Sequence, residues 1–335
     1  MLIRRTVGVI VLLGLLGALV LGLREAERRV FGGGSSPGAE VTVTIPKGSG
    51  TAAIGTILEK AKVIDSASRF ELEAFSETGL QAGTYVLHVN DGYKRAIAAL
   101  KAGPPVRPTK QLLIPEGLAA RDIAGLTPKI GLKAADYDAA VKQAKPPAGF
   151  LAKGEQAASM EGFLFPATYD VAQPPTGAEL VDQQLAAFDT NFAEVDLSKA
   201  KTKNLTAYDV LKIASLIERE AAYGPDRRKI AAVIYNRLKA KMSLGIDATI
   251  QYAVGSWAPL KASDLEIQSP YNSRKVKGLP PTPICAPGLA SLKAAANPAN
   301  VNYLYYVAIP GDPDRKHFFT NSYDAFLQYQ KDHPA

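Results

Sequence analysis

Hydrophobic residues dominate the first stretch of the chain. Residues 6–23 form an uncharged, mostly apolar run, with Arg4 and Arg5 before it and Arg24 after it. Eighteen residues are at the short end of what a membrane-spanning helix needs. A cleaved signal peptide is the alternative, but its apolar core is usually only about 7–15 residues long. We therefore expect residues 1–30 to hold a cytoplasmic tip and a single-pass transmembrane helix in the lipid of the inner membrane, with the remainder on the periplasmic or extracellular side.

A linker and a small folded unit are predicted next. Residues 31–40, FGGGSSPGAE, are rich in Gly, Ser and Pro, which is typical of a flexible linker. In residues 41–103, alternating hydrophobic residues in VTVTI and YVLHV predict two strands, and helical spacing predicts helices between and after them. The segment GPPVRPTK, with three prolines in eight residues, then reads as a second linker.

The remaining region, residues 110–333, mixes strand and helix patterns. Strand-like segments occur at its start, KQLLIP, and near its end, YLYYVAI. Helical spacing predicts five helices, at residues 134–144, 178–193, 206–223, 227–242 and 288–296. Because the elements follow no regular β–α repeat, the predicted fold class is α+β. The nucleotide-binding patterns GxGxxG and GxxxxGK[ST] and the GxSxG elbow are absent from the sequence.

Two glutamates stand in the apolar run KIASLIEREAAYG. On a helix over residues 208–223, Glu220 would neighbour Leu216 and Ile217, whereas Glu218 would point about 160° away. Burial would raise the pKa of Glu220 and keep it protonated near neutral pH, the state that a general acid needs. Both glutamates are also compatible with a solvated helix surface, so spacing alone favours Glu220 only slightly.

Composition narrows the possible functions. The net charge of +7 is mild and spread along the chain, without basic blocks interleaved with aromatic residues, so nucleic acid is not an expected partner. Cys285 is the only cysteine, which excludes an intramolecular disulfide and a cysteine-rich zinc site. The histidines His88, His317 and His333 are far apart in the sequence. We expect neither a bound metal nor a cofactor.

Several later segments carry polar and aromatic residues that could line a groove. They are VIYNRL, DATIQYAVG, SPYNSRKVKGLPPTPICAPG and HFFTNSYDAF. Asn236 and Arg237 could equally cap or pair on a helix, and His317 could be an ordinary surface histidine. Together with EGFLFPATYDV and IASLIEREA, in this order and spacing, these segments resemble the MltG/YceG-like endolytic murein transglycosylases. The resemblance extends over nearly the whole chain.

The resemblance implies a membrane-anchored lyase that acts on peptidoglycan. Such enzymes cleave the MurNAc-β-1,4-GlcNAc bond within glycan strands and leave 1,6-anhydroMurNAc ends. The family's catalytic glutamate, the second in its IExE motif, falls on Glu220. Because the muramic acid C6 hydroxyl is the nucleophile, one residue can make both proton transfers. The resemblance also implies substrate-binding roles for nine residues, which are Glu161, Tyr169, Asn236, Asp247, Thr249, Gln251, Tyr271, Asn272 and His317.

The resemblance further implies a domain order and partners. Residues 41–103 would be a LysM-like βααβ unit, which either binds glycan or docks structurally, and residues 110–333 a YceG-like catalytic domain. Membrane peptidoglycan synthases would be partners, and the enzyme would terminate the elongation of nascent strands. Many relatives have Asn where this chain has Ala286, so that side chain is not required here.

Three alternatives stay open at this point. One is a hydrolytic muramidase that acts on the same substrate, and another is a non-enzymatic, membrane-tethered scaffold that binds peptidoglycan. The third is an anchored substrate-binding protein, which only the basic charge supports. For Glu218 we expect a structural role. The candidate partners for its carboxylate are three arginines, Arg219, Arg227 and Arg228.

Overall fold

The computed structural model describes residues 38–105 and 107–334. Within them, no helix combines the length and the apolar character needed to cross a membrane. The anchor predicted for residues 1–30 and most of the predicted linker at 31–40 lie outside the described residues. The chain divides into two units between Arg107 and Pro108, and each has its own hydrophobic core.

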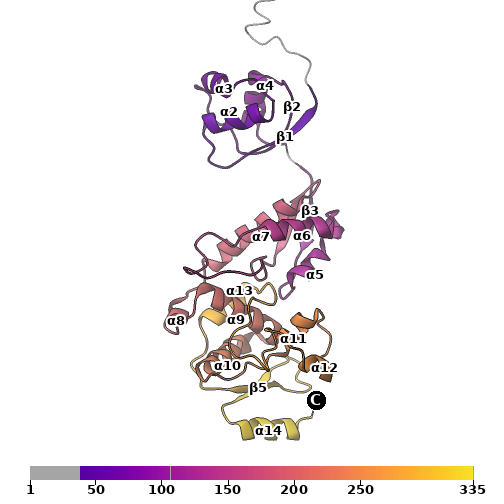
Figure 1. Ribbon diagram of the computed structural model, residues 1–335, viewed down its shortest axis with the longest axis vertical. Coiled ribbons are helices and arrows are strands. Elements are labelled where there is room, and N and C mark those ends of the chain that lie inside the picture. The colour runs from indigo at the N-terminus through magenta and orange to yellow at the C-terminus, as the bar shows by residue number, and fades with distance from the viewer. Residues whose placement is uncertain (1–37, 106, 335) are drawn as a thin grey trace, which may run out of the picture. The chain divides into compact units, whose positions relative to one another are not determined.

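The first unit is a two-stranded antiparallel sheet packed with three helices (Figure 1). The alternation of hydrophobic residues puts Val43 and Ile45 of the first strand, and Tyr85 and Leu87 of the second, into the core. The order strand–helix–helix–strand follows the prediction, and its likeness to a LysM unit stays a prediction. The elements are β1 (Glu40–Ile45), α2 (Thr51–Lys60), α3 (Ala67–Glu73), β2 (Gly83–His88) and α4 (Tyr93–Ala102).

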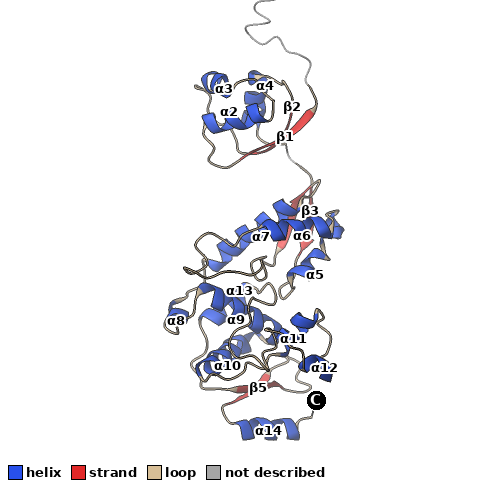
Figure 2. Cartoon of the chain, in the orientation of Figure 1, coloured by secondary structure: helices blue, strands red, loops and turns tan. Residues whose placement is uncertain are grey.

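The second unit is mixed α+β, as predicted, with two separate antiparallel strand pairs among its helices (Figure 2). Its elements are β3 (Thr109–Leu113), α5 (Ala120–Ala124), η1 (Thr127–Ile130), α6 (Ala134–Gln143), β4 (Thr168–Ala172), α7 (Gly177–Phe192), α8 (Ser198–Lys201), α9 (Ala207–Glu220), η2 (Gly224–Asp226), α10 (Arg227–Lys239), α11 (Asp247–Val254), α12 (Ala262–Leu265), α13 (Leu289–Ala296), β5 (Tyr305–Ala308), β6 (His317–Thr320) and α14 (Tyr323–Asp332).

Helix α9 lies at the centre of the second unit and packs against α10, α11 and α13. Thr206 caps its first turn by accepting the backbone N–H of Asp209, whose carboxylate accepts the N–H of Thr206 in return. The helix ends at Glu220, three residues before the end that the sequence predicted. The reason is local, because Ala221 adopts an extended ψ of 92° and Pro225 follows shortly after.

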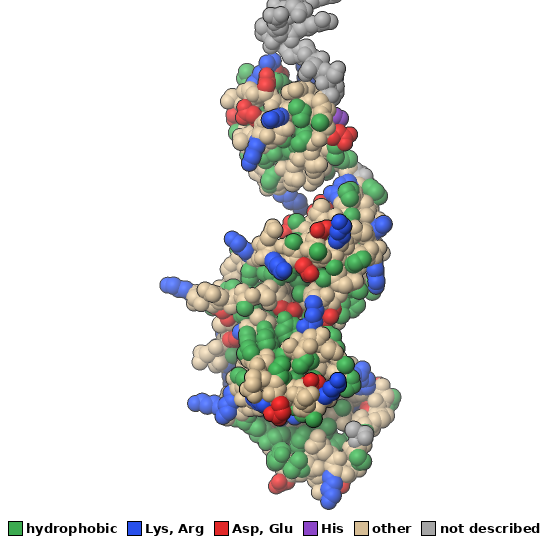
Figure 3. Space-filling view, turned by 45° about the vertical axis from the view of Figure 1, so that its right-hand side comes forward, with side chains coloured by type: hydrophobic (Ala, Val, Ile, Leu, Met, Phe, Trp, Pro, Cys, Tyr) green, Lys and Arg blue, Asp and Glu red, His purple; other side chains and the backbone are tan. Residues whose placement is uncertain are grey.

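The C-terminal part of the unit is the β5–β6 hairpin with α14 beside it (Figure 1). Tyr306 pairs with Phe319 and Ala308 with His317, so these four residues share one face of the hairpin. Side chains of the opposite face pack on α14, where Phe318 stacks on Tyr329. No residue of α14 is fully buried, and hydrophobic side chains gather over this end of the unit in Figure 3.

Candidate active site

Glu220 is held at the end of α9 by a hydrogen bond from the C-terminal hairpin. Its Oε2 accepts the hydroxyl of Tyr306 over 2.8 Å. Desolvation by the surrounding protein raises the pKa of the Glu220 carboxyl. Burial is the largest effect on this pKa. The Tyr306 hydrogen bond and the positive charge of Arg219 lower it, and the negative charge of Asp247 raises it. The carboxyl therefore keeps its proton to a higher pH than a free glutamate, as a general acid requires.

Glu218 occupies a different environment, although it is only two residues away. Its Oε2 accepts the backbone N–H of Gly288 over 3.0 Å, at the start of α13. The prediction that Glu218 forms an ion pair with Arg219, Arg227 or Arg228 was wrong. Within the described residues, no ion pair joins Glu218 to any of these arginines, and its carboxylate binds the backbone of Gly288 instead. The backbone bond lets one carboxylate fix the end of α9 to the start of α13.

Arg219 separates the two glutamates and points into a cluster of aromatic and acidic side chains. Its Nη1 donates to the carbonyl of Gly117 over 3.1 Å, and its guanidinium carbon lies 3.8 Å from the centre of the Trp257 ring. Trp257 donates its indole N–H to Asp122 over 2.8 Å. Three consecutive residues at the end of α9 are thus tied to three different segments, which leaves Glu220 little freedom to move.

Asp247 is the predicted site residue whose charge acts directly on Glu220. It begins α11, and its Oδ1 binds Arg274 at 2.8 Å from Nε and 2.7 Å from Nη2. Both side chains are about half exposed, so this is a solvent-facing ion pair. Its negative charge raises the pKa of Glu220, so the two carboxyl groups interact electrostatically.

His317 lies behind Tyr306 and not at an open surface. Its side chain is 8% exposed, and its ring meets the Tyr306 ring edge to face at 5.5 Å between centres. The Nδ1 atom lies 3.2 Å from Oδ2 of Asp226, which also accepts the backbone N–H of His317. His317 therefore contacts Tyr306, which in turn binds Glu220.

Glu161 is buried, which the sequence analysis did not anticipate for a substrate-binding residue. It is 5% exposed, and both carboxyl oxygens lie within hydrogen-bond reach of the backbone N–H of Ala120. Its Oε2 also accepts the Tyr252 hydroxyl over 3.1 Å. Burial raises the pKa of Glu161 to about 7, against the lowering effect of these hydrogen bonds. Glu161 joins the start of α5 to α11.

Four more of the predicted binding residues use their side chains to hold backbone carbonyls. These contacts fix the segments that lead into α11 and β5 and those that follow α11 and α12. The donors and acceptors are Asn236 to Val301 and Tyr303, Thr249 to Ile246, Gln251 to Trp257 and Ala258, and Asn272 to Leu265 and Ile267. The structure thus places these four groups as loop supports.

The two remaining predicted residues are tyrosines in different parts of the unit. Tyr169 lies on β4, is 6% exposed and donates to the carbonyl of Phe165 over 2.6 Å. It belongs to the core formed around β3, β4, α6 and α7. Tyr271 packs on Tyr252 and shares a 2.8 Å hydrogen bond with Thr282.

Sequence reasoning missed Tyr306, Asp226, Arg274 and Trp257. The only signal for Tyr306 was the alternating aromatic strand YLYYVAI, which predicted a strand but not the glutamate that it meets 86 residues earlier. Among the described residues, no three His, Cys, Asp or Glu side chains are grouped as metal ligands would be.

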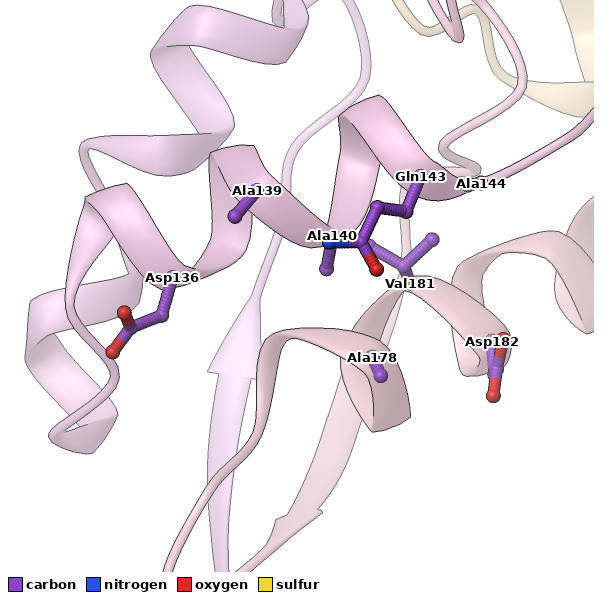
Figure 4. A pocket seen from close by; sticks show the side chains of 8 residues that line it. All are labelled: Asp136, Ala139, Ala140, Gln143, Ala144, Ala178, Val181 and Asp182. Carbon is purple, nitrogen blue, oxygen red and sulfur yellow. The ribbon is translucent and has the colours of Figure 1, made fainter.

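A groove also opens between α6 and α7, away from Glu220 (Figure 4). The side chains that line it are mainly small, with Ala139, Ala140 and Ala178 in the middle and Asp136 and Asp182 at its sides. Glu220, Tyr306 and Asp247 are not among its lining residues. Its only carboxyl groups, Asp136 and Asp182, stand at opposite sides of the groove. The chemistry is better supported at the end of α9, where the Tyr306 hydroxyl holds the Glu220 carboxyl.

Comparison with known proteins shows which family the chain is similar to. The model of the YceG-like family matches residues 43–332. An endolytic murein transglycosylase of Bacillus subtilis is 34% identical over 283 residues, covering 80% of this chain and 78% of its own. A protein of the same name from Streptococcus pneumoniae is 35% identical over 305 residues, and the match covers 80% of this chain but only 54% of the streptococcal one.

A solved structure is similar as well. The crystal structure of a putative YceG-like protein from Listeria monocytogenes superposes with a TM-score of 0.57 at 32% sequence identity. The match covers 88% of this chain and the whole of the Listeria chain.

Proposed function

The chain belongs to the YceG-like family, and from this premise we propose that it is an endolytic peptidoglycan lytic transglycosylase. Its substrate would be the glycan strand of peptidoglycan, cut at the MurNAc-β-1,4-GlcNAc bond. Its product would be a 1,6-anhydroMurNAc end. The observation that carries the proposal is the partly buried Glu220, whose pKa is raised and whose Oε2 is already occupied by Tyr306.

In the first step, protonated Glu220 gives its proton to the leaving glycosidic oxygen. The Tyr306 hydroxyl donates to Oε2, which favours the proton on Oε1 and leaves Oε1 to meet the substrate. Positive charge then develops on the muramic acid ring, as it does in other glycosidic cleavages. The carboxylate of Asp247, which acts electrostatically on Glu220, would stabilise this charge.

In the second step, the Glu220 carboxylate takes the proton of the muramic acid C6 hydroxyl as that oxygen attacks C1. One bond from C1 to the leaving oxygen is broken and one to O6 is formed. The leaving oxygen keeps the first proton, and Glu220 is protonated again by the proton from the C6 hydroxyl. Intramolecular attack has the advantage of a high effective concentration. A single carboxyl is enough for this cycle, and Glu218, bound to Gly288, is not needed.

A hydrolytic muramidase is the second candidate, and the observation that favours it is Asp247. A hydrolase needs a second carboxylate, either as nucleophile or as base for water. Asp247 interacts electrostatically with Glu220 and is exposed, but its Oδ1 is bound to Arg274. The products separate the two functions, because hydrolysis gives a reducing end one water heavier than the anhydro end.

We further propose that residues 1–30 anchor the protein in the inner membrane, with the two folded units on its outer side. Working there, the enzyme would terminate nascent strands beside membrane peptidoglycan synthases. Residues 41–103 would bind glycan and hold the strand near the catalytic unit. Protease protection in spheroplasts tests the orientation, and comparing the binding of the full-length chain to sacculi with that of a chain lacking residues 41–103 tests the glycan-binding role.

The experiment for the reaction itself is digestion of isolated sacculi with the purified full-length chain. Mass analysis of the released fragments should find anhydromuropeptides, with both internal and terminal cuts represented. Products with reducing ends only would show hydrolysis. No released product from an enzyme that binds sacculi would support a non-enzymatic scaffold instead.

A further inference from the structure

We propose that His317 and Asp226 are positioning residues for this reaction, which act on Glu220 through the Tyr306 hydroxyl. The inference rests on the proposed function, because it assigns these residues to the acid–base step. Neither is placed to touch the substrate, since the His317 side chain is 8% exposed and that of Asp226 is 2% exposed. Their effect must therefore pass through the residues that they contact.

The strand register brings His317 to Tyr306. In the β5–β6 hairpin, Tyr306 is opposite Phe319 and His317 is opposite Ala308. His317 and Tyr306 are thus diagonal neighbours on one face, close enough for ring contact. The alanine leaves room for the imidazole to lean toward Tyr306, and the rings meet edge to face at 5.5 Å and 81°. Phe319 completes this face at 5.9 Å from Tyr306.

Asp226 fixes the orientation of the imidazole. Its Oδ2 accepts both the backbone N–H of His317, over 2.9 Å, and Nδ1–H of the ring, over 3.2 Å. A carboxylate can only accept, so the contact requires the proton on Nδ1. The other oxygen, Oδ1, lies 3.2 Å from Nζ of Lys229. Asp226 ends η2, directly before α10, and so it ties the hairpin to the helical part of the unit.

The consequence for the reaction is geometric. The Tyr306 hydroxyl sits at the far end of a ring whose tilt is set by His317, and it contacts Oε2 of Glu220 at 2.8 Å. A small rotation of the Tyr306 ring would lengthen this hydrogen bond and free the carboxyl to turn. The geometry points to a series of contacts, Asp226 to His317 to Tyr306 to Glu220, that aims the acid at the glycosidic oxygen.

The test is a double-mutant cycle in the full-length chain, with His317→Asn and Tyr306→Phe. The Asn amide takes the place of Nδ1–H and can keep the bond to Asp226, so the ring contact alone is removed. On uncrosslinked glycan strands we expect His317→Asn to lower kcat about tenfold with KM unchanged, because misplacing the acid affects the transition state. In the Tyr306→Phe background the same substitution should leave kcat within twofold.

The matched control is Phe318→Leu. Phe318 lies on the same strand but on the opposite face, where it stacks on Tyr329 at 4.1 Å. This change weakens the hairpin without touching Tyr306, and kcat should stay within twofold of the unaltered chain. If Phe318→Leu lowers kcat as much as His317→Asn, general loosening of the hairpin explains the loss and the inference is overturned.

The remaining outcomes also decide the question. Equal losses from His317→Asn in both Tyr306 backgrounds would show that His317 acts independently, and the inference fails while the proposed function stands. Full activity of Glu220→Gln, included in the same series, would instead remove the proposed function. If His317→Asn shows no cooperative thermal unfolding, Asp226→Asn replaces it in the cycle, with the same expected non-additivity and the same contradicting result.

Discussion

The hydroxyl of Tyr306 lies 2.8 Å from Oε2 of Glu220 and joins the C-terminal hairpin to the last residue of α9. The two residues are 86 positions apart in the sequence. This bond gives the carboxyl a fixed orientation, while burial holds its proton. Most of the expected behaviour of the enzyme follows from these two effects.

Replacing Tyr306 by Phe removes the hydrogen bond and keeps the ring. The bond lowers the pKa of Glu220, so its loss should raise that pKa. The active form carries the proton, and activity falls as pH rises through this pKa, so the basic limb of the kcat/KM profile should move to higher pH. We expect kcat to fall about tenfold from poorer orientation. A basic limb that moves to lower pH would contradict this account.

The variant Asp247→Asn should move the basic limb of the kcat/KM profile to lower pH, the opposite of the Tyr306→Phe shift. The charge of Asp247 raises the pKa of Glu220, so its removal should lower that pKa and shift the basic limb to lower pH. Arg274→Gln is the control, because it breaks the ion pair but leaves the carboxylate charge in place. Both profiles are measured on the same glycan strands. Complete loss of activity in Asp247→Asn alone would favour the hydrolytic mechanism with two carboxylates.

The stability of the protein should depend on pH through Glu161. The carboxyl has a pKa of about 7 in the folded protein, against an ordinary 4.5, so the folded state holds more protons between these values. The free energy of unfolding must therefore fall as pH rises from 4.5 to 7, by roughly 3 kcal/mol. Glu161→Gln lacks this titration.

Denaturant unfolding of both proteins at several pH values measures the effect. Other titrating groups cancel in the difference between Glu161→Gln and the unaltered chain. As pH rises from 4.5 to 7, the free energy of unfolding of Glu161→Gln should increase relative to that of the unaltered chain. Above pH 7 the difference between the two should stay constant. A difference that does not vary with pH would show that Glu161 titrates normally.

Gly162, which follows the buried Glu161, should be among the glycines that are hardest to replace. Its φ is +87°, and a Cβ added there would lie 2.6 Å from Cγ of Pro283. Gly162→Ala should therefore cost about 3 kcal/mol or more, from strain and overlap together. Gly154→Ala is the matched control, with a φ of +83° but open space around it, and should cost only about 1 kcal/mol. Equal losses in the two unfolding curves would contradict the close contact with Pro283.

Local pattern predicted the elements that have strong periodicity. Alternation in VTVTI predicted β1, and the apolar spacing around Leu211 and Leu216 predicted α9. Helices α11 and α14 were not predicted. Helix α11 has only eight residues and begins at a polar segment after Gly245. In α14, Tyr323, Phe326 and Leu327 do have helical spacing, which the sequence analysis did not use.

The site was only partly predictable for a different reason. The preference for Glu220 over Glu218 rested on helical geometry and the family resemblance, and the structure gives the two residues different partners. Which groups meet Glu220 depends on how distant segments pack. The pairing of β5 with β6 brings Tyr306 and His317 together, and no local spacing encodes that register. Glu161 likewise looked available for substrate, whereas folding buries it.

The most direct measurement is the release of anhydromuropeptides from isolated sacculi by Glu220→Gln and Glu218→Gln, compared at equal protein concentration and matched thermal stability. The account predicts that Glu220→Gln releases less than about one-hundredth of the normal amount, as expected when the proton donor is removed. Glu218→Gln should keep most activity, because its contact with Gly288 N–H needs only an acceptor oxygen. Normal release by Glu220→Gln, or loss of release in Glu218→Gln alone, would contradict the assignment of Glu220 as the acid and base.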